Sequence, residues 1–258
     1  MNYNIVDTVT KKNENILVVA MDHTLYFGKQ AGLENTKDVI KSLVDKDVDG
    51  FISSPAITRQ CLEDPSIPTT KYISRADYYL SKNSVPYGFD QEEYCVITSA
   101  QALKDIGADA AIISLVFGYS NSAAQIKNIS SVAKFAEDCS KVNLPLIVET
   151  VMWGNRVDKS EERDVENIAS IVKTGAELGA SMIKAPYFGT PEEYSMVVRE
   201  SPVPLGILGG PRIENDDEVV QLTKSGLESG AKGVFFGRNI WQAQNPGQMV
   251  EKLVNVLK

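Results

Sequence analysis

The stretch "AAIISLVF", residues 110–117, is apolar at all but one position and rich in side chains that favour strands. A strand with one face in water alternates apolar and polar residues, whereas a strand covered on both faces of a parallel sheet does not. Helical patterns flank the stretch, "SAQALKDIG" at 99–107 and "AQIKNISSVAKFAEDCSKV" at 124–142. It is therefore predicted to be a parallel strand enclosed by helices.

The same unit of an apolar run and a helical pattern recurs along the whole chain. Several of the helical patterns end in Gly or Asn, which is a common helix stop signal. Eight such units in 258 residues, with no linker between them, predict a single (β/α)8 barrel over residues 1–258. A doubly wound sheet is the alternative. The weakly periodic segment at about 75–94 is predicted to be a long loop over the mouth of the barrel. The seven other predicted strands are 16–23, 49–55, 69–75, 145–153, 181–187, 204–210 and 233–239.

Composition excludes several classes of partner. The formal net charge is -8 and no Lys/Arg-rich run is present, which argues against nucleic-acid or anionic-membrane binding. No apolar stretch suits a signal peptide or a membrane span. The three cysteines are scattered and make no CxxC pair, and the chain has one histidine, so neither disulfides nor a metal site are expected. We expect a cytoplasmic protein.

In a barrel of this kind the active site lies at the carboxyl ends of the strands. The sixth run carries a lysine, Lys184, among apolar residues. Lys184 alternates with the apolar Ile183 and Ala185 and is predicted to point into the barrel. Burial disfavours the ammonium form, and a free amine attacks carbonyl carbons to form a Schiff base. The alternatives are a lysine paired permanently with a carboxylate, or one that extends its amine to water.

Two carboxylates are predicted at the same rim. Asp22 ends the first run and would support the lysine and move a substrate hydroxyl proton, or else cap the following loop. Glu149 lies within the fifth run and is expected to pair with Lys184, as a structural ion pair or as a proton shuttle. His23 is predicted to face outward and is not placed in the catalytic set.

The last two runs end in residues that suit an anion. Gly209, Gly210 and Gly237 allow backbone N–H groups to approach a ligand closely, and Arg238 adds a charge. A phosphate site after the seventh and eighth strands is a recurring feature of these barrels. The alternative is that the glycines only turn the chain. Together these residues predict a small phosphorylated carbonyl substrate.

Four stretches carry a resemblance to a known family: "MDHTLYFGKQAGLEN", "MIKAPYFGTPEEYSMVV", "PLGILGGPR" and "GVFFGRNIWQ". They resemble the archaeal-type class I aldolases of the DeoC/FbaB family. That group includes fructose-bisphosphate aldolases, 2-amino-3,7-dideoxy-heptulosonate synthases and thiolase-like enzymes acting on autoinducer-2 phosphate. The resemblance implies a barrel enzyme without cofactor that forms homo-oligomers. It also implies a Schiff base on Lys184, with Asp22 beside it and phosphate at the Gly/Arg cluster.

The chain departs from the family in the fifth run. In the archaeal aldolases of this type the run resembles "W-S-Y-P-R-G", which puts Glu149 at the tryptophan position and Val151 at the position of the acid/base tyrosine. The proton transfers that this tyrosine would carry out fall to Glu149, to Tyr187 or to a water molecule. The sequence therefore predicts a Schiff-base aldolase acting on a small phosphorylated ketose of the fructose-bisphosphate or dihydroxyacetone-phosphate type. Alternatives are a transaldolase-like heptulosonate synthase, a thiolase-like enzyme on a phosphorylated diketone, and, in another class, a sugar-phosphate isomerase or non-catalytic binder.

Overall fold

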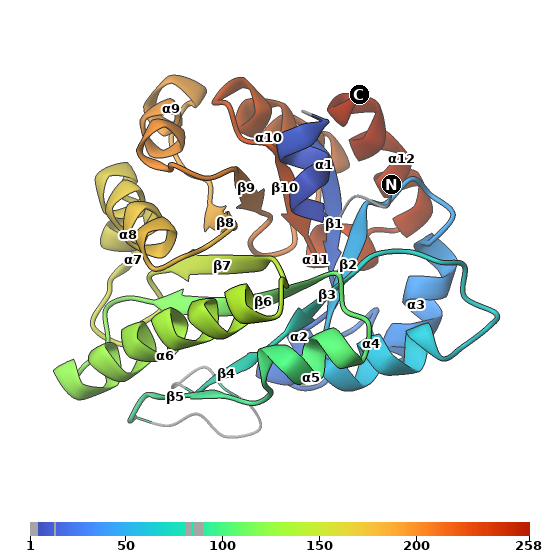
Figure 1. Cartoon of the computed structure of the whole chain (residues 1–258). Helices are drawn as coiled ribbons and strands as arrows, with labels where there is room; N and C mark the ends of the chain where they lie inside the picture. Colours follow the sequence, from blue (N-terminus) through green and yellow to red (C-terminus); the bar gives the residue numbers. More distant parts are fainter. Residues whose placement is uncertain (1–4, 13, 81–83, 85–89) are drawn as a thin grey trace.

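Eight parallel strands close into a barrel, which confirms the predicted fold (Figure 1). The computed structural model describes residues 5–12, 14–80, 84 and 90–258. Around the barrel the strands follow the order β1-β10-β9-β8-β7-β6-β3-β2, and every neighbouring pair is parallel. Each strand lies within one of the predicted runs. They are β1 (Ile16–Ala20), β2 (Gly50–Ser53), β3 (Tyr72–Arg75), β6 (Ala110–Val116), β7 (Leu146–Val151), β8 (Met182–Pro186), β9 (Leu205–Leu208) and β10 (Gly233–Phe236).

Helices surround the barrel, as Figure 1 shows. Several begin where a polar side chain accepts a hydrogen bond from the first helical turn; Thr190 and Glu193, for example, form a reciprocal capping box at the start of α9. The described helices are α1 (Ile5–Lys11), α2 (His23–Phe27), α3 (Thr36–Leu43), α4 (Pro55–Leu62), α5 (Ala100–Asp105), α6 (Ser122–Lys141), α7 (Lys159–Arg163), α8 (Val165–Glu177), α9 (Pro191–Glu200), α10 (Asp216–Glu228), α11 (Arg238–Trp241) and α12 (Pro246–Leu257). No helix among these is long and apolar enough to cross a membrane.

Side chains point alternately into the barrel and toward the helices along each strand, which produces two separate apolar clusters. Ile147 and Met182 belong to the smaller cluster, which collects the inward residues of the barrel and is joined by Ile5 of α1. Val148 and Ile183 belong to the larger cluster, which packs against the helices. Since side chains alternate, Glu149 and Lys184 share the inward face with Ile147 and Met182. The predicted orientation of both residues is therefore confirmed.

The segment predicted as a long loop at about 75–94 is in part a β-hairpin, and the prediction is corrected here. Strands β4 (Asp77–Leu80) and β5 (Glu93–Val96) pair antiparallel. Each is only four residues long and mixes charged with aromatic side chains, so neither shows a run that the sequence pattern could detect. Residues 81–83 and 85–89 of the predicted loop lie outside the described residues.

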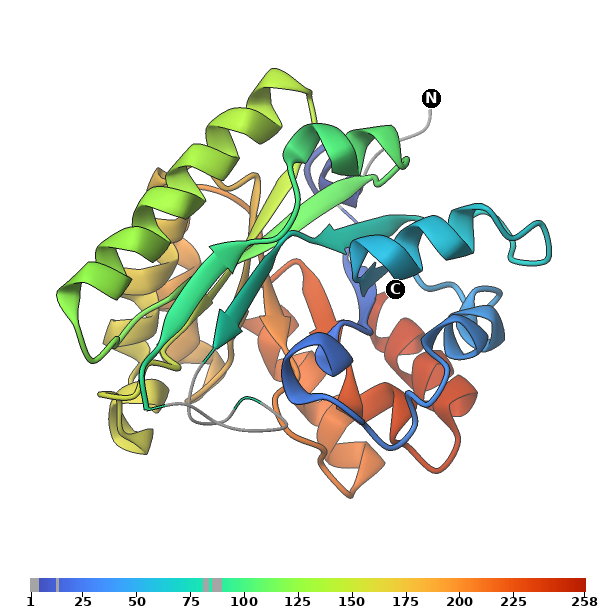
Figure 2. The same ribbon diagram turned by 90° about the horizontal axis from the view of Figure 1, so that it is seen from below.

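A buried carboxylate fixes this hairpin beside the barrel mouth. Glu92 accepts hydrogen bonds from Tyr79 Oη (2.8 Å), from the backbone N–H of Ser120 (2.6 Å) and from that of Asn155 (2.6 Å). Its three partners lie on β4, after β6 and after β7. Figure 2 views the molecule from this end, where the hairpin and α2 lie in front of the barrel.

Candidate active site

Lys184 occupies the middle of β8 with its ammonium group beside a carboxylate. Its backbone lies in register with Glu149 on β7 and with Gly206 on β9. Nζ of Lys184 is 2.7 Å from Oε1 of Glu149, and the lysine side chain is only 5% exposed. The pairing expected from the sequence is thus present, in a position where water scarcely reaches it.

Arg75, at the end of β3, connects the carboxylates of the site and was not anticipated from the sequence. It is 2% exposed. Its Nε donates to Asp22 Oδ2 at 2.7 Å, and its Nη2 donates to Glu149 Oε2. Its Nη1 donates to Ser114 Oγ at 3.0 Å and to Asp77 Oδ1 at 3.3 Å. One guanidinium therefore bridges three buried carboxylates.

The charges in this cluster keep two of the acids ionised. Burial by itself raises the pKa of Glu149, but the nearby charges of Lys184 and Arg75 outweigh burial and lower that pKa below its usual value. For Asp22 burial again acts upward, and the charges of Arg75 and Lys184 again lower the pKa. Asp77 behaves differently, because burial dominates there and raises its pKa. Glu149 and Asp22 are consequently carboxylates at neutral pH.

Asp22 lies just beyond β1, at the first position of the turn into α2. Its side chain makes no capping hydrogen bond with that helix. The carboxylate is instead held by Arg75 and is 4% exposed. Helix capping, the alternative considered from the sequence, is therefore not what this side chain does.

His23 was predicted to face outward, and the structure corrects this. The strand ends at Ala20, so strand alternation no longer applies two and three residues later. The imidazole lines the pocket next to Gly237 and packs edge-on against Trp241, with ring centroids 5.4 Å apart. Its Nδ1 is buried without a hydrogen-bond partner among the described residues and lies 3.8 Å from Asp22 Oδ1. Burial, together with the charges of Lys184 and Arg238, lowers its pKa to about 4.

Replacing His23 by glutamine is expected to reduce the loss of stability on acidification. The pKa of His23 is about 4 in the folded chain and roughly 6.5 when exposed. Between these values the unfolded chain binds a proton that the folded chain does not, so folding stability falls as the pH drops. His23 is the only histidine, which isolates the effect.

The comparison is urea unfolding of both proteins at about pH 7.5 and about pH 4.5. We expect the unchanged protein to lose on the order of 2 kcal/mol more than His23→Gln between these pH values. Carboxylates also titrate in this range, but they are the same in both proteins. An equal loss in the two proteins would contradict a lowered imidazole pKa at this position.

A pocket of about 460 Å³ opens at this end of the barrel. Lys184 and Glu149 line it, as do all four residues predicted to bind phosphate: Gly209, Gly210, Gly237 and Arg238. Asp22 is not among its lining residues and lies beneath, in contact with Arg75. The structure therefore brings the predicted lysine, Glu149 and the Gly/Arg cluster to one cavity.

Two of the glycines meet specific steric demands. Gly210 has a φ of 65°, a conformation that glycine adopts at little cost. At Gly237 an added Cβ would lie 2.4 Å from Cε1 of His23 and 2.8 Å from the carbonyl oxygen of Ala20. Glycine is thus favoured at 210 by the backbone conformation and at 237 by the close approach to His23 and Ala20.

Arg238 lines this side of the pocket, and the buried Asn239 lies behind the lining. Burial lowers the pKa of Arg238, whose Nε is buried and has no hydrogen-bond partner among the described residues. Asn239, which sequence reasoning missed, donates to the carbonyl of Gly209 at 2.7 Å and accepts from the N–H of Ile213 at 2.8 Å. It therefore fixes the loop after β9 to the start of α11.

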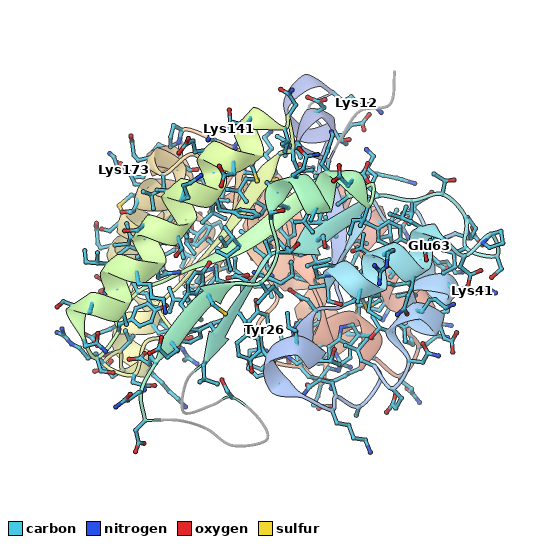
Figure 3. All side chains as sticks on the ribbon, turned by 60° about the horizontal axis from the view of Figure 1, so that its bottom comes forward. Lys12, Tyr26, Lys41, Glu63, Lys141 and Lys173 are labelled. Atoms are coloured by element: carbon cyan, nitrogen blue, oxygen red, sulfur yellow. The ribbon has the colours of Figure 1, made fainter. Side chains whose placement is uncertain are left out.

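Tyrosines were considered as replacements for the missing acid/base residue. Tyr187 packs against Tyr194 of α9, with centroids 4.7 Å apart, and does not line the pocket. Tyr26 of α2 does line it, and was missed by the sequence reasoning. Figure 3 labels Tyr26 at this end of the molecule, away from the surface lysines 12, 141 and 173. Its hydroxyl donates to Asp77 Oδ1 at 3.1 Å and its ring lies 5.5 Å from the Arg75 guanidinium carbon.

Comparison with known proteins places this geometry in context. The DeoC/LacD family of aldolases matches residues 16–243. An uncharacterized aldolase of Saccharolobus solfataricus is 27% identical over 93% of this chain and 89% of its own length. A 2-amino-3,7-dideoxy-D-threo-hept-6-ulosonate synthase of Halobacterium salinarum is also 27% identical, over 95% of this chain and 87% of its own.

The fold is shared with solved structures. An archaeal fructose-1,6-bisphosphate aldolase, whose catalytic lysine is covalently bound to the carbinolamine intermediate of its substrate, superposes with a TM-score of 0.84. The alignment covers 98% of this chain and 99% of that one at 23% identity.

Proposed function

The chain belongs to the DeoC/LacD aldolase family, and on that basis we propose that it is a class I aldolase. Lys184 is the Schiff-base residue, and the substrate is a small phosphorylated ketone or ketose. The single observation that carries the proposal is the ammonium of Lys184, which lines the pocket 2.7 Å from the Glu149 carboxylate. Among the structures of the same fold is an archaeal aldolase with a carbinolamine on its catalytic lysine.

Glu149 and Arg75 would position the lysine and move its protons. In its free-amine form Lys184 attacks the substrate carbonyl to give a carbinolamine, and the Glu149 carboxylate, 2.7 Å from Nζ, is placed to relay the amine proton to the carbinolamine oxygen. Loss of water then yields an iminium, which accepts electrons when the adjacent C–C bond breaks. Arg75 holds the Glu149 carboxylate in place through Oε2 while Oε1 faces Lys184. Asp22, also held by Arg75, does not line the pocket and would support the reaction through its charge and through Arg75.

The Gly/Arg cluster would hold the substrate phosphate. Gly209 and Gly210 follow β9, next to the lysine strand, while Gly237 and Arg238 follow β10. The unpaired Nε of Arg238 is the kind of donor that a phosphate oxygen satisfies. A phosphate fixed there would keep the carbonyl carbon over Lys184 and reduce the entropy lost on reaction.

Replacing Arg238 by alanine is expected to raise KM for phosphorylated ketones by about 10- to 100-fold, the range for loss of a charge-assisted contact. The KM for the same ketone without phosphate should change by less than about threefold. Steady-state kinetics with both substrates test this, and Arg199→Ala on α9 is the control because Arg199 lies outside the pocket lining. If both KM values rise together, the phosphate assignment is wrong.

A second candidate within the same chemistry is a transaldolase-like synthase. Two observations favour it over a fructose-bisphosphate aldolase. Curated relatives from Halobacterium and Streptomyces, each 27% identical, bear synthase names. Val151 stands where the resemblance puts the acid/base tyrosine of a standard fructose-bisphosphate aldolase. A synthase transfers the ketone fragment to a second carbonyl compound and needs the same lysine. Product analysis with and without a second carbonyl substrate separates the two reactions.

Loss of activity on reduction tests the lysine mechanism itself. Borohydride reduces an iminium to a stable amine, so borohydride plus dihydroxyacetone phosphate should inactivate the protein, while either reagent alone should not. A sugar-phosphate isomerase or a non-catalytic binder would be unaffected by the combination.

A further inference from the structure

Lys184 divides the pocket into two unlike halves. In the barrel order β10-β9-β8-β7 the lysine strand lies between the strands that carry the Gly/Arg cluster and the strand that carries Glu149. The half toward β9 and β10 contains Arg238 and the three glycines, together with the apolar Leu208, Pro211 and Phe235. The half toward β7 is lined by four apolar side chains from the segments after β7 and β8: Met152, Trp153, Val157 and Phe188. We call these four residues the apolar wall.

The charges near the apolar wall do not suit a second phosphate. The described lining residues there include one cation, the exposed Lys159, and one anion, Glu162. Arg163 lies 5.6 Å over the Phe188 ring and is not part of the lining. Opposite charges at an exposed rim largely cancel, and water screens them. Among the described residues, this half therefore lacks the converging donors found around Arg238.

Three of the four residues of the apolar wall, Met152, Trp153 and Val157, lie on a tightly held loop after β7. The N–H of Gly154 donates to Phe117 O at 3.0 Å and that of Asn155 to Glu92 Oε1 at 2.6 Å. A Cβ on Gly154 would lie 2.0 Å from the backbone of Gly118, so this loop and the loop after β6 are in close contact. Trp153 is nevertheless 38% exposed, an unusual state for so large an apolar side chain in a tightly held loop.

From these observations we infer that the apolar wall is the binding subsite for the second carbonyl compound, and that this compound is an aldehyde with an apolar, unphosphorylated side chain. The inference rests on the proposed aldolase function and adds the substrate class. In the forward direction the enamine carbon on Lys184 forms a bond to the aldehyde carbon, whose oxygen takes a proton. Water then releases a monophosphorylated product from the lysine.

The test compares two acceptor aldehydes with dihydroxyacetone phosphate as donor. Phenylacetaldehyde presents an apolar ring and glyceraldehyde 3-phosphate presents a second phosphate. We expect kcat/KM to be at least about tenfold higher for phenylacetaldehyde, the effect of one buried aromatic contact. Trp153→Ala should lower kcat/KM for phenylacetaldehyde by about tenfold and leave the value for glyceraldehyde 3-phosphate within about twofold.

Two controls define the outcome. Trp153→Phe should retain most of the preference, and Ile126→Ala, on α6 with a side chain that is 61% exposed, should have no effect. A preference for glyceraldehyde 3-phosphate, or an equal effect of Trp153→Ala on both aldehydes, overturns the inference. Borohydride trapping with dihydroxyacetone phosphate alone separates a failure of this inference from a failure of the proposed function. If an adduct forms but the acceptor preference is wrong, only the inference about the apolar wall fails. If no adduct forms, the proposed aldolase function fails as well.

Discussion

Replacing Lys184 by methionine is expected to reduce kcat by about 10⁴-fold or more, the scale on which removal of a covalent nucleophile acts. Methionine fills a similar volume but cannot form a Schiff base. The fold should persist, because Glu149 keeps its contact with Arg75. Binding of inorganic phosphate at the Gly/Arg cluster should also persist. Steady-state kinetics, thermal unfolding and phosphate titration calorimetry together check the three statements.

The matched control is the same substitution at an exposed lysine. Lys173 on α8 pairs with Glu200 at the surface, 2.7 Å away, and is labelled in Figure 3. Lys173→Met should leave kcat and phosphate binding unchanged. Retention of kcat within about tenfold in Lys184→Met would show that the lysine is not the nucleophile.

Replacing Arg75 by methionine is expected to cost about 3–5 kcal/mol of unfolding free energy. The guanidinium bridges Asp22, Asp77 and Glu149 in a site that is nearly closed to water. Without it, only Lys184 remains among the cluster's cations to balance these acids. Urea unfolding at neutral pH measures the loss. Adding Glu149→Gln to the methionine variant should restore part of the stability, since one uncompensated charge disappears.

Arg75→Lys separates positioning from stability. One ammonium cannot donate along three directions, so the Glu149 carboxylate loses its fixed orientation toward Lys184. We expect kcat to fall by about 100-fold while KM for the phosphorylated ketone stays within about threefold. The pH dependence of kcat should shift as well, because the charge of Arg75, together with that of Lys184, lowers the pKa of Glu149 and of Asp22. A variant with lowered stability but unchanged kcat and pH profile would give Arg75 a structural role only.

The barrel could be predicted because its signal is local. Each parallel strand is covered on both faces, so each leaves a short apolar run that is visible without knowing its neighbours. Lys184 and Glu149 could be placed for the same reason: both lie within regular strands, where alternation gives the direction of the side chain. The hairpin of β4 and β5 leaves no such run.

The charge network could not be predicted, because its partners are distant in sequence. Arg75 contacts Asp22 and Glu149, which are 53 and 74 positions away. One signal was available: Arg75 shares alternation with Ile73, an inward residue of β3. An inward arginine at a strand end implies buried acids, yet the sequence does not say which. His23 was misplaced for a different reason, since the strand pattern was extended into the turn that begins α2.

The most direct test of the account is the intact mass of the protein after borohydride treatment with dihydroxyacetone phosphate, followed by peptide mapping. The account predicts one reduced adduct per chain, located on Lys184 and absent from Lys184→Met. No adduct, or an adduct on another lysine, would contradict the central claim that Lys184 is the Schiff-base residue of this pocket.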